Sequence, residues 1–400
     1  MKKHVGILFP SAQSGGVYQY ALSIADSLIA HAGGFQYSLI SYEEQQPRLF
    51  TTQSMASVHR ILMPHSHAFF FRKSLHLLSL ATKSRFFLLR DFQKILSKNS
   101  IDLVIIPTPF SFAIPSRTPY IAGIPDLMHR YYPEFPEYDI IERVTRDVVY
   151  GYYAKNSLLN VVDSEQGSKD VEKFLGVGKE KNRVISYIPP SYIYRYKNMN
   201  YEEQERILAA YNLPERYIFY PAQFWFQKNH ERLIKALHFI RERYHVAIPL
   251  VLVGSVEGRG RPNVYKTLFS LIRSLGMEGQ VRHLGYVTNQ EMVALYKKAI
   301  ALVAPPFQGP TTIPPLEAMM LGTPVATVSL YGVPSQVGDG ALLFDPFHTE
   351  DMAEKIYALW KDENLRNTLR ERGYQRTKTM TQEAYAEKWE RVIQEAFTMI

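Results

Sequence analysis

The segment Pro305–Pro324 (PPFQGPTTIPPLEAMMLGTP) has the composition of a loop that holds a phosphate. A short apolar run ends at Ala304, a loop rich in Gly, Pro and Thr follows, and a helix is predicted to begin near Pro314. Proline is favoured at a first helical position because it has no N–H group to leave unsatisfied there. The amides of Thr312 and Ile313 then lie at a helix N-terminus, which carries about half a positive charge and attracts anions. This loop is the first candidate anion site.

Glu317 stands in the predicted first turn of this helix, Pro314–Leu321. A carboxylate at that place can accept hydrogen bonds from two neighbouring sugar hydroxyls, such as those of a ribose. It can equally do no more than complement the helix dipole. The local pattern leaves both interpretations open.

A second segment, Tyr220–His230 (YPAQFWFQKNH), places the cation Lys228 immediately before a predicted helix of residues 229–243. A lysine at a helix start opposes the dipole and is a poor choice for stability. A bound anion beside the ammonium removes that conflict. We therefore predict a phosphate partner for Lys228, with a solvated lysine as the alternative.

A third segment, Ser14-Gly15-Gly16, follows the first predicted strand. Glycines allow a backbone to approach a ligand closely and to turn into a helix. The sequence SGGVYQ does not match the G-x-G-x-x-G fingerprint of dinucleotide-binding folds, which disfavours a nicotinamide dehydrogenase.

The elements that must position these segments alternate short apolar runs with amphipathic stretches, which is typical of parallel βαβ units. In the first half the pattern predicts a helix at Val17–Ala30 and strands at His4–Phe9, Gln36–Ser41, Ile101–Ile106, Tyr120–Ile124, Leu158–Asp163 and Arg183–Ile188. The polar, Tyr-rich stretch Ser191–Pro214 is interpreted as the connection between two domains.

A second series of elements begins after this connection. Strands are predicted at Tyr217–Tyr220, Pro249–Val253, Val281–Leu284, Ile300–Ala304, Pro324–Val328 and Ala341–Phe344, and helices at Lys228–Tyr244, Val264–Leu275, Asn289–Lys298, Pro314–Leu321 and Thr381–Phe397. Thr288 or Asn289 would cap its helix. A chain of 400 residues also exceeds what one core usually supports. The predicted fold is α/β, with two doubly wound Rossmann-like domains (1–195 and 196–380) facing across a cleft and a C-terminal helix (381–400) crossing back to the first.

Composition narrows the class of protein further. The chain is 46% apolar and 21% charged, which is ordinary for a globular protein, and it has no cysteine. It therefore has neither a disulfide framework nor a thiolate metal site. No D-x-D triplet suggests a divalent metal, and no cofactor is implied. No window reaches the ~18–20 apolar residues that span a bilayer, so we expect a cytoplasmic protein, at most peripheral on a membrane.

Much of the net charge of +8 lies between Arg60 and Lys98, where cations alternate with Phe and Leu side chains. Basic and bulky apolar residues together are typical of a segment that lies on an anionic membrane surface. The candidate membrane-surface residues are Arg72, Lys73, Arg85 and Arg90. Alternatively, the aromatic residues are core and the cations a solvated face. Nucleic-acid binding has no motif to support it.

Taken together, these segments resemble glycosyltransferase family 4, the retaining GT-B enzymes. The resemblance rests on Lys228-Asn229, Val281–Val287 (VRHLGYV), Leu316–Met319 (LEAM) and Gly322–Val325 (GTPV), with Pro125–Arg130 (PDLMHR) and Asp163-Ser164-Glu165 in the first half.

The resemblance implies a nucleotide-sugar donor (a GDP-, UDP- or dTDP-sugar) held mainly by the second domain, and an acceptor held by the first. Lys228 would contact the diphosphate, Glu317 the ribose, and Gly15 and Gly16 the transferred sugar. Asp126 is the acidic candidate for contact with the acceptor or the sugar, unless it only caps a turn. The donor-binding set is completed by Gln223, Gly309, Thr311, Thr312 and Ile313. Ser164 and Glu165 are interpreted as a helix cap and its first turn.

Three positions depart from the family pattern. Gly309 stands where the first of two glutamates is usual, Gln223 where an arginine is usual, and Pro125 where a histidine precedes Asp126. The expected activity is transfer of a hexose or deoxyhexose, with retention, to a glycan or lipid-linked oligosaccharide in surface polysaccharide assembly. The alternatives are a non-catalytic GT-B subunit that supports a partner transferase, and a sugar-nucleotide epimerase.

Overall fold

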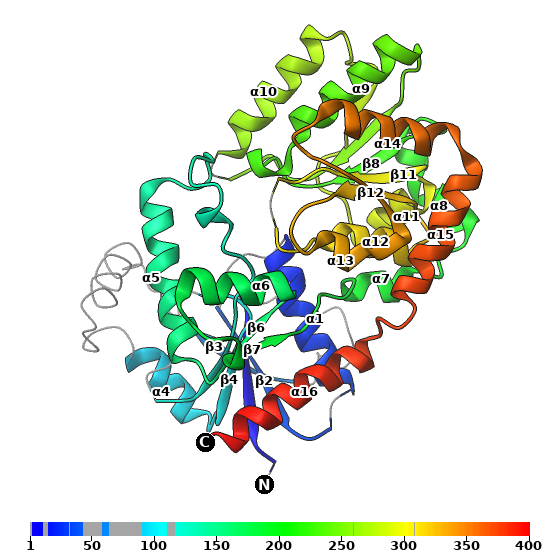
Figure 1. The fold of residues 1–400 in the computed structure, drawn as a ribbon. Coiled ribbons are helices and arrows are strands. Elements are labelled where there is room, and N and C mark those ends of the chain that lie inside the picture. Colours follow the sequence, from blue (N-terminus) through cyan, green and yellow to red (C-terminus); the bar gives the residue numbers. More distant parts are fainter. Residues whose placement is uncertain are drawn as a thin grey trace. The chain divides into compact units, whose positions relative to one another are not determined.

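The computed structural model describes residues 2–10, 15–31, 33–42, 58–63, 90–109, 117–258, 260–307 and 309–400. The chain forms two compact α/β units (Figure 1). Unit 1 comprises Met1–Glu134, Tyr138–Ile188 and Thr381–Ile400, and unit 2 comprises Phe135–Glu137 and Pro189–Met380. None of the helices in these described ranges is long and apolar enough to cross a membrane.

Unit 1 is built on a parallel sheet with the strand order β3-β2-β1-β4-β5-β6-β7. The strands are β1 (His4–Leu8), β2 (Gln36–Tyr42), β3 (His59–Met63), β4 (Leu103–Ile106), β5 (Tyr120–Gly123), β6 (Leu159–Val162) and β7 (Asn182–Val184). The order reverses between β1 and β4. In such sheets, ligands bind beyond the carboxyl ends of the strands at the point of reversal. Strand β3 was not predicted, and the other six lie where the sequence predicted them, with shifted ends.

The helices of unit 1 cover the apolar side chains of this sheet. They are α1 (Gly16–His31), α4 (Arg90–Lys98), α5 (Ile140–Asn156), α6 (Glu165–Asp170) and α16 (Gln382–Thr398), with short helical turns at Met128–Arg130, Val171–Leu175 and Lys179–Lys181. The last helix, α16, lies against α1 (Figure 1). Glu390 of α16 accepts a hydrogen bond from the Gly34 amide at 3.0 Å, and Phe397 stacks on Phe35. The C-terminal segment is therefore part of unit 1.

Unit 2 has a parallel sheet in the order β10-β9-β8-β11-β12-β13. Its strands are β8 (Ile218–Pro221), β9 (Leu250–Val253), β10 (Val281–His283), β11 (Ala301–Ala304), β12 (Val325–Val328) and β13 (Ala341–Phe344). All six were predicted. The order reverses between β8 and β11, so a ligand site is expected beyond the carboxyl ends of these two strands.

The stretch from Ser191 to Pro214 was predicted wrongly as a connection. It forms α7 (Ser191–Tyr196), α8 (Tyr201–Leu208) and a short turn at Ala209–Tyr211, and α7 and α8 pack against α11. The other helices of unit 2 are α9 (His230–Tyr244), α10 (Arg261–Ser274), α11 (Asn289–Lys298), α12 (Ile313–Met320), α13 (Val333–Val337), α14 (Thr349–Lys361) and α15 (Glu363–Thr377), with turns at Phe226–Lys228 and Gly338–Gly340. Asn200 caps α8, so short polar residues here start a helix.

Two predicted helix starts have the expected capping residues. Thr288 accepts the Glu291 amide, and the Glu291 carboxylate accepts the Thr288 amide in return, which is a complete capping box. Ser164 caps α6 and Glu165 lies in its first turn, as predicted.

Candidate functional site

The candidate site in unit 2 lies where the loops after β8 and β11 meet. The Phe307 amide donates to the Gln227 carbonyl at 2.9 Å, which joins the two loops directly. The Asn229 side-chain amide donates to the Pro305 carbonyl at 2.9 Å and makes a second connection. Because β8 and β11 flank the reversal of strand order, these contacts hold the walls of the expected ligand crevice in place.

Lys228 ends the short turn Phe226–Lys228, and α9 begins two residues later, at His230. Asn229 intervenes in the left-handed region (φ 58°), so the predicted helix start at residue 229 was one residue early. The Lys228 carbonyl accepts from the Tyr220 hydroxyl at 3.0 Å, and its side chain is half-buried. The lysine therefore stands on a fixed backbone at the carboxyl end of β8.

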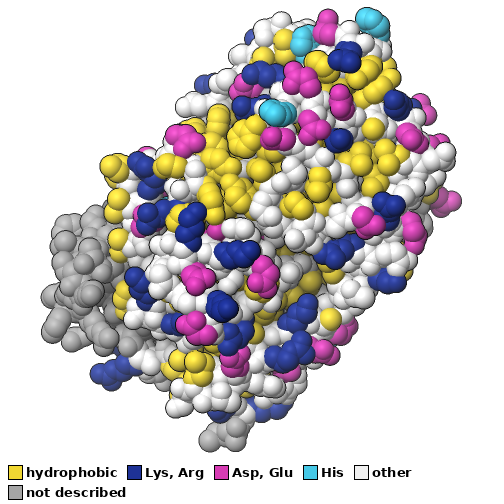
Figure 2. Space-filling model, viewed as in Figure 1, with side chains coloured by type: hydrophobic (Ala, Val, Ile, Leu, Met, Phe, Trp, Pro, Cys, Tyr) yellow, Lys and Arg dark blue, Asp and Glu magenta, His cyan; other side chains and the backbone are white. Residues whose placement is uncertain are grey.

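A cluster of four phenylalanines supports the same loops: Phe135 and Phe307 are buried, and Phe226 and Phe347 are exposed. The rings of Phe226 and Phe307 lie 6.0 Å apart, and Phe135 contacts both. Glu137 accepts the Gln227 amide at 3.0 Å. Figure 2 shows hydrophobic side chains gathered in a broad area of unit 2 on the face drawn. The cluster places the segment Phe135–Glu137 against the loop that carries Lys228. No local sequence pattern predicted this contact.

The start of α12 offers fewer amides than the sequence predicted. The Thr312 amide donates to the Gln336 side-chain oxygen at 3.0 Å, so the prediction that it is available to a phosphate was wrong. Positions 314 and 315 are prolines and have no N–H groups. Of the helix's first three residues, only Ile313 can donate to a ligand, and among the described residues its amide has no partner.

Gly309 precedes this helix with φ 131°, a conformation that other residues rarely adopt. A Cβ atom there would lie 2.9 Å from the Thr311 carbonyl oxygen. The backbone of this loop is thus shaped around glycine, where the related pattern has a glutamate.

Glu317 is the fifth residue of α12 and not part of its first turn, which corrects the prediction. Its side chain is buried. One carboxylate oxygen accepts from the Tyr192 hydroxyl at 2.6 Å, and the other accepts from the Tyr296 hydroxyl at 2.5 Å. Burial raises the pKa of Glu317, and the two tyrosine hydrogen bonds lower it in part. Any sugar hydroxyl that binds here shares the carboxylate with two phenols or displaces one.

Gln223 belongs to a chain of side chains that ends in an arginine. Its side-chain oxygen accepts from the Trp225 indole N–H at 3.0 Å, and the Arg261 guanidinium lies over the Trp225 ring, 4.9 Å from its centre. Arg261 is the first residue of α10, at the carboxyl end of β9 beside β8. The buried Nε atom of its guanidinium has no hydrogen-bond partner in the described ranges, and burial lowers the pKa of Arg261.

Sequence reasoning missed Arg261. The available signal was a second cation at a helix start, the same conflict with the helix dipole that singled out Lys228. The run of glycines around it concealed the helix start.

His230 is buried beside Lys228, with its ring stacked on Phe224 at 4.8 Å between centres. Neither ring nitrogen has a hydrogen-bond partner of normal geometry among the described residues. Burial, helped by the positive charge of Lys228, lowers the pKa of His230 from 6.5 to about 3. The imidazole is therefore neutral in the folded protein.

This burial makes a testable prediction about stability and pH. The unfolded chain takes up the His230 proton near its ordinary pKa of 6.5 and the folded chain only near 3, so stability is lost as pH falls between them. At about 1.4 kcal/mol per pH unit, the loss at about pH 5 is roughly 2 kcal/mol. His230→Phe keeps the ring stacking and removes this loss. Urea unfolding at neutral pH and near pH 5 measures it, and an equal acid-induced loss in the variant would contradict the assignment.

In unit 1, Asp126 follows β5 and caps a turn. Its carboxylate accepts from the Met128 amide at 3.1 Å and lies 3.6 Å from the Arg146 guanidinium. This is the structural alternative weighed from the sequence, and the carboxylate remains partly exposed. His129, three residues on, is fully buried and bonded through Nε2 to Asp147 at 2.8 Å.

The other predicted positions of unit 1 are placed only in part. Gly15, at φ 90°, comes directly before α1, and Gly16 is the first residue of that helix, with no atom within 4 Å of where a Cβ would lie. Both are at the carboxyl end of β1, at the reversal of strand order. Arg72, Lys73 and Arg85 lie outside the described residues; Arg90 begins α4, but its side chain is not described.

Comparison with known proteins gives this architecture its class. Residues 202–376 match the family model described as "Glycosyl transferases group 1". The chain is 29% identical over 178 residues to the O-antigen chain mannosyltransferase B of Escherichia coli, an alignment that covers 44% of this chain and 45% of the relative. The aligned part of this chain thus spans less than half the length of that relative.

Solved structures extend the likeness over both units. The sucrose-phosphate synthase of Thermosynechococcus elongatus superimposes with a TM-score of 0.76 at 17% identity, covering 100% of both chains. Anabaena HepE in complex with UDP-glucose superimposes with a TM-score of 0.73 at 15% identity, covering 98% of this chain and 99% of that one. The fold is that of the GT-B glycosyltransferases, which confirms the prediction of two parallel-sheet α/β domains.

Proposed function

We propose that the protein is a glycosyltransferase that moves a hexose or deoxyhexose from a nucleotide-diphosphate sugar to a glycan or lipid-linked acceptor in surface polysaccharide assembly. The match of residues 202–376 to group 1 glycosyl transferases carries the proposal. The joined loops after β8 and β11, with Lys228 on one and the start of α12 on the other, give it a donor site. A relative named as an O-antigen mannosyltransferase makes mannose the first sugar to test.

The site would act chiefly on the leaving group. A departing nucleoside diphosphate gains negative charge, and groups aimed at that charge lower the barrier because they are already oriented. Lys228 supplies an ammonium and Ile313 one backbone N–H. We assign retention of configuration, with the leaving phosphate as the base, so that no protein base is needed.

The direct test is turnover with a panel of donors. GDP-mannose, UDP-glucose and a dTDP-deoxyhexose are each incubated with the protein and a lipid-extracted glycan acceptor, and nucleoside diphosphate release and glycan extension are measured. We expect one donor to be consumed with acceptor-dependent product, whose anomeric configuration is read by NMR. An inverted product would exclude retention but leave the transferase in place.

Arg261 gives the donor site a second cation and a further prediction. We assign it the role of the arginine that is absent at Gln223, because the Trp225 ring ties the two positions together. A hydrogen bond to a charged group is worth about 1.5–3 kcal/mol, so Arg261→Gln should raise the donor KM or lower kcat/KM by roughly ten- to hundredfold. Arg273→Gln, which changes an exposed arginine of the same helix, is the control. Equal effects of both changes would refute this role.

The engaged carboxylate of Glu317 favours a second candidate, a non-catalytic subunit. Both of its oxygens already accept hydrogen bonds, and the usual partner glutamate is replaced by Gly309. A subunit of this kind would bind a nucleotide diphosphate weakly or not at all and would consume no donor. Absence of turnover with every donor, together with restored turnover on adding a partner transferase, would favour it.

A further inference from the structure

Glu317 is the buried carboxylate of the candidate donor site, and it is only 6% exposed. Its side-chain partners among the described residues are two tyrosines: the Tyr192 hydroxyl donates to Oε1 at 2.6 Å and the Tyr296 hydroxyl to Oε2 at 2.5 Å. Burial and the neighbouring charge of Glu317 raise the pKa of both tyrosines, so each hydroxyl keeps its proton and is the donor. In this state little of the carboxylate is left for a ligand to reach.

The two tyrosines are held differently. Tyr296 lies on α11 and is completely buried, with its ring packed edge-on against Phe219 of β8 at 5.0 Å between centres. Tyr192 is the second residue of α7, a helix of six residues, and lies partly exposed at the margin of the core. A close-packed core resists the rotation of a buried ring, whereas a partly exposed side chain can change rotamer. Tyr192 is therefore the partner that can leave Glu317, and Tyr296 the one that stays.

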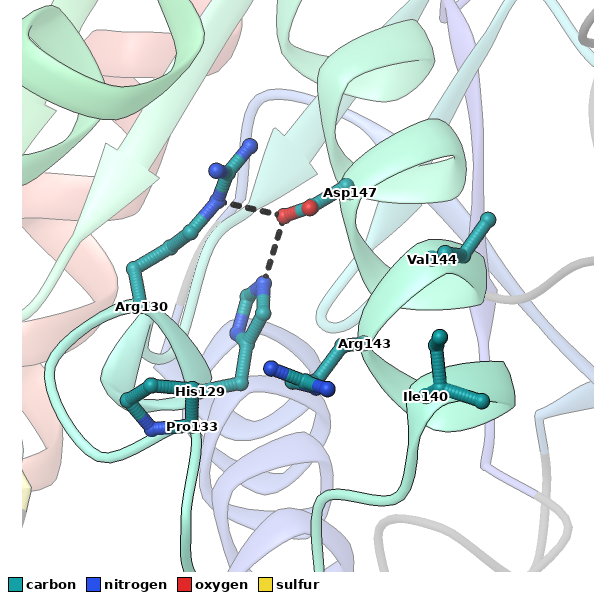
Figure 3. Close-up of a pocket in the computed structure, with 7 residues that line it drawn as sticks. All are labelled: His129, Arg130, Pro133, Ile140, Arg143, Val144 and Asp147. Atoms are coloured by element: carbon teal, nitrogen blue, oxygen red, sulfur yellow. Dashed lines mark hydrogen bonds and ion pairs between the residues drawn. The ribbon is translucent and has the colours of Figure 1, made fainter.

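The partners of Glu317 are also neutral, which allows one hydroxyl to be exchanged for another. Asp147 in unit 1 has the contrasting arrangement, because it accepts from Arg130 Nε at 2.6 Å and from His129 Nε2 at 2.8 Å beside α5 (Figure 3). A sugar hydroxyl that replaced that guanidinium would cost Asp147 a charge-assisted hydrogen bond. At Glu317 a sugar hydroxyl replaces a phenol hydroxyl, and the carboxylate keeps the same number of neutral donors.

We propose that Tyr192 is a gate on Glu317: its hydroxyl covers Oε1 in the empty protein and is displaced by a pentose hydroxyl when a nucleoside diphosphate binds. Tyr296 stays on Oε2 and keeps the carboxylate oriented. The gate rests on the proposed function, in which Glu317 meets the ribose of the donor. It lowers the apparent affinity for any ligand that uses Glu317, because only the open fraction of the protein can bind it.

Calorimetric titration of the full chain with GDP, UDP and dTDP tests the gate without an assay of transfer. Tyr192→Phe keeps the ring and removes the hydroxyl, so the preferred nucleotide should bind about tenfold more tightly, the equivalent of about 1.4 kcal/mol. The same change leaves a buried carboxylate with one donor fewer, so the urea midpoint of the unliganded protein should fall. Lower stability together with tighter binding distinguishes a gate from a residue that only supports the fold.

Tyr296→Phe should have the opposite effect on binding. It removes the donor that stays in place, so the preferred nucleotide should bind more weakly than it does to the parent. Tyr194→Phe is the matched control on α7, because the Tyr194 hydroxyl donates to the Met380 carbonyl at 2.5 Å and not to Glu317. Nucleotide affinity in this variant should equal that of the parent.

The 2′,3′-dideoxy form of the preferred nucleotide is the matched control ligand. It has no pentose hydroxyl to replace the phenol, so Tyr192→Phe should not tighten its binding. An equal gain for the dideoxy nucleotide would refute the gate. Unchanged or weaker binding of the preferred nucleotide by Tyr192→Phe would also refute it, while the proposed donor site stands. If neither the parent nor Tyr192→Phe binds any of the three nucleotides, the donor site itself is wrong and the gate with it.

Discussion

Lys228→Ala is expected to lower kcat/KM for the preferred donor by about 10²–10³-fold, the usual effect of removing one group that stabilises charge on a leaving oxygen. The lysine stands at the carboxyl end of β8, next to the reversal of strand order, on a loop hydrogen-bonded to the loop after β11. Its ammonium would face the diphosphate, so the loss should be larger in kcat than in donor KM. Steady-state kinetics of donor consumption with saturating acceptor measures both constants.

Lys235→Ala is the matched control for this change. Lys235 lies on the same helix, α9, is half-exposed, and pairs with Glu231 at 2.6 Å. Surface ion pairs of this kind contribute little, so its kinetics should stay within about twofold of the parent. A Lys228→Ala enzyme as active as the Lys235→Ala enzyme would remove the ammonium from the mechanism and with it the strongest residue-level argument for the donor site.

The predictions that succeeded rest on local patterns. Short apolar runs that end in Gly, Pro or Asp mark parallel strands well, because such strands are buried on both faces. All six strands of unit 2 and the capping box at Thr288 follow from residues within a few positions of one another. The joining of the loops after β8 and β11 then follows from strand order alone.

The failures concern contacts between residues far apart in the chain. Tyr192 reaches Glu317 across 125 positions, and Gln336 takes the Thr312 amide from 24 positions away. The residues that neighbour Glu317 and Thr312 in the sequence give no indication of either hydrogen-bond partner. The place of Arg261 over Trp225 likewise depends on β8 and β9 being neighbours in the sheet, although its position at a helix start was a local signal. A helix start predicts where an anion can bind, but the fold decides which donors are already engaged.

The place of α16 in unit 1 supports the last prediction. Trp389 lies on α16 and is completely buried. Replacing a buried tryptophan by alanine typically costs about 3–5 kcal/mol, so Trp389→Ala should lower the urea midpoint of unit 1 strongly. Arg391→Ala, an exposed position on the same helix, should leave that midpoint unchanged.

Trp389→Ala also changes what tryptophan fluorescence reports. The chain has three tryptophans, and the two that remain after Trp389→Ala, Trp225 and Trp360, both belong to unit 2. Fluorescence then reports unit 2 alone, while circular dichroism reports both units. We expect the dichroism of the variant to show an early transition that the fluorescence lacks, because the helix that lost its buried ring packs against α1 of unit 1. A single coincident transition at the parent's midpoint would mean that α16 contributes nothing to the stability of unit 1.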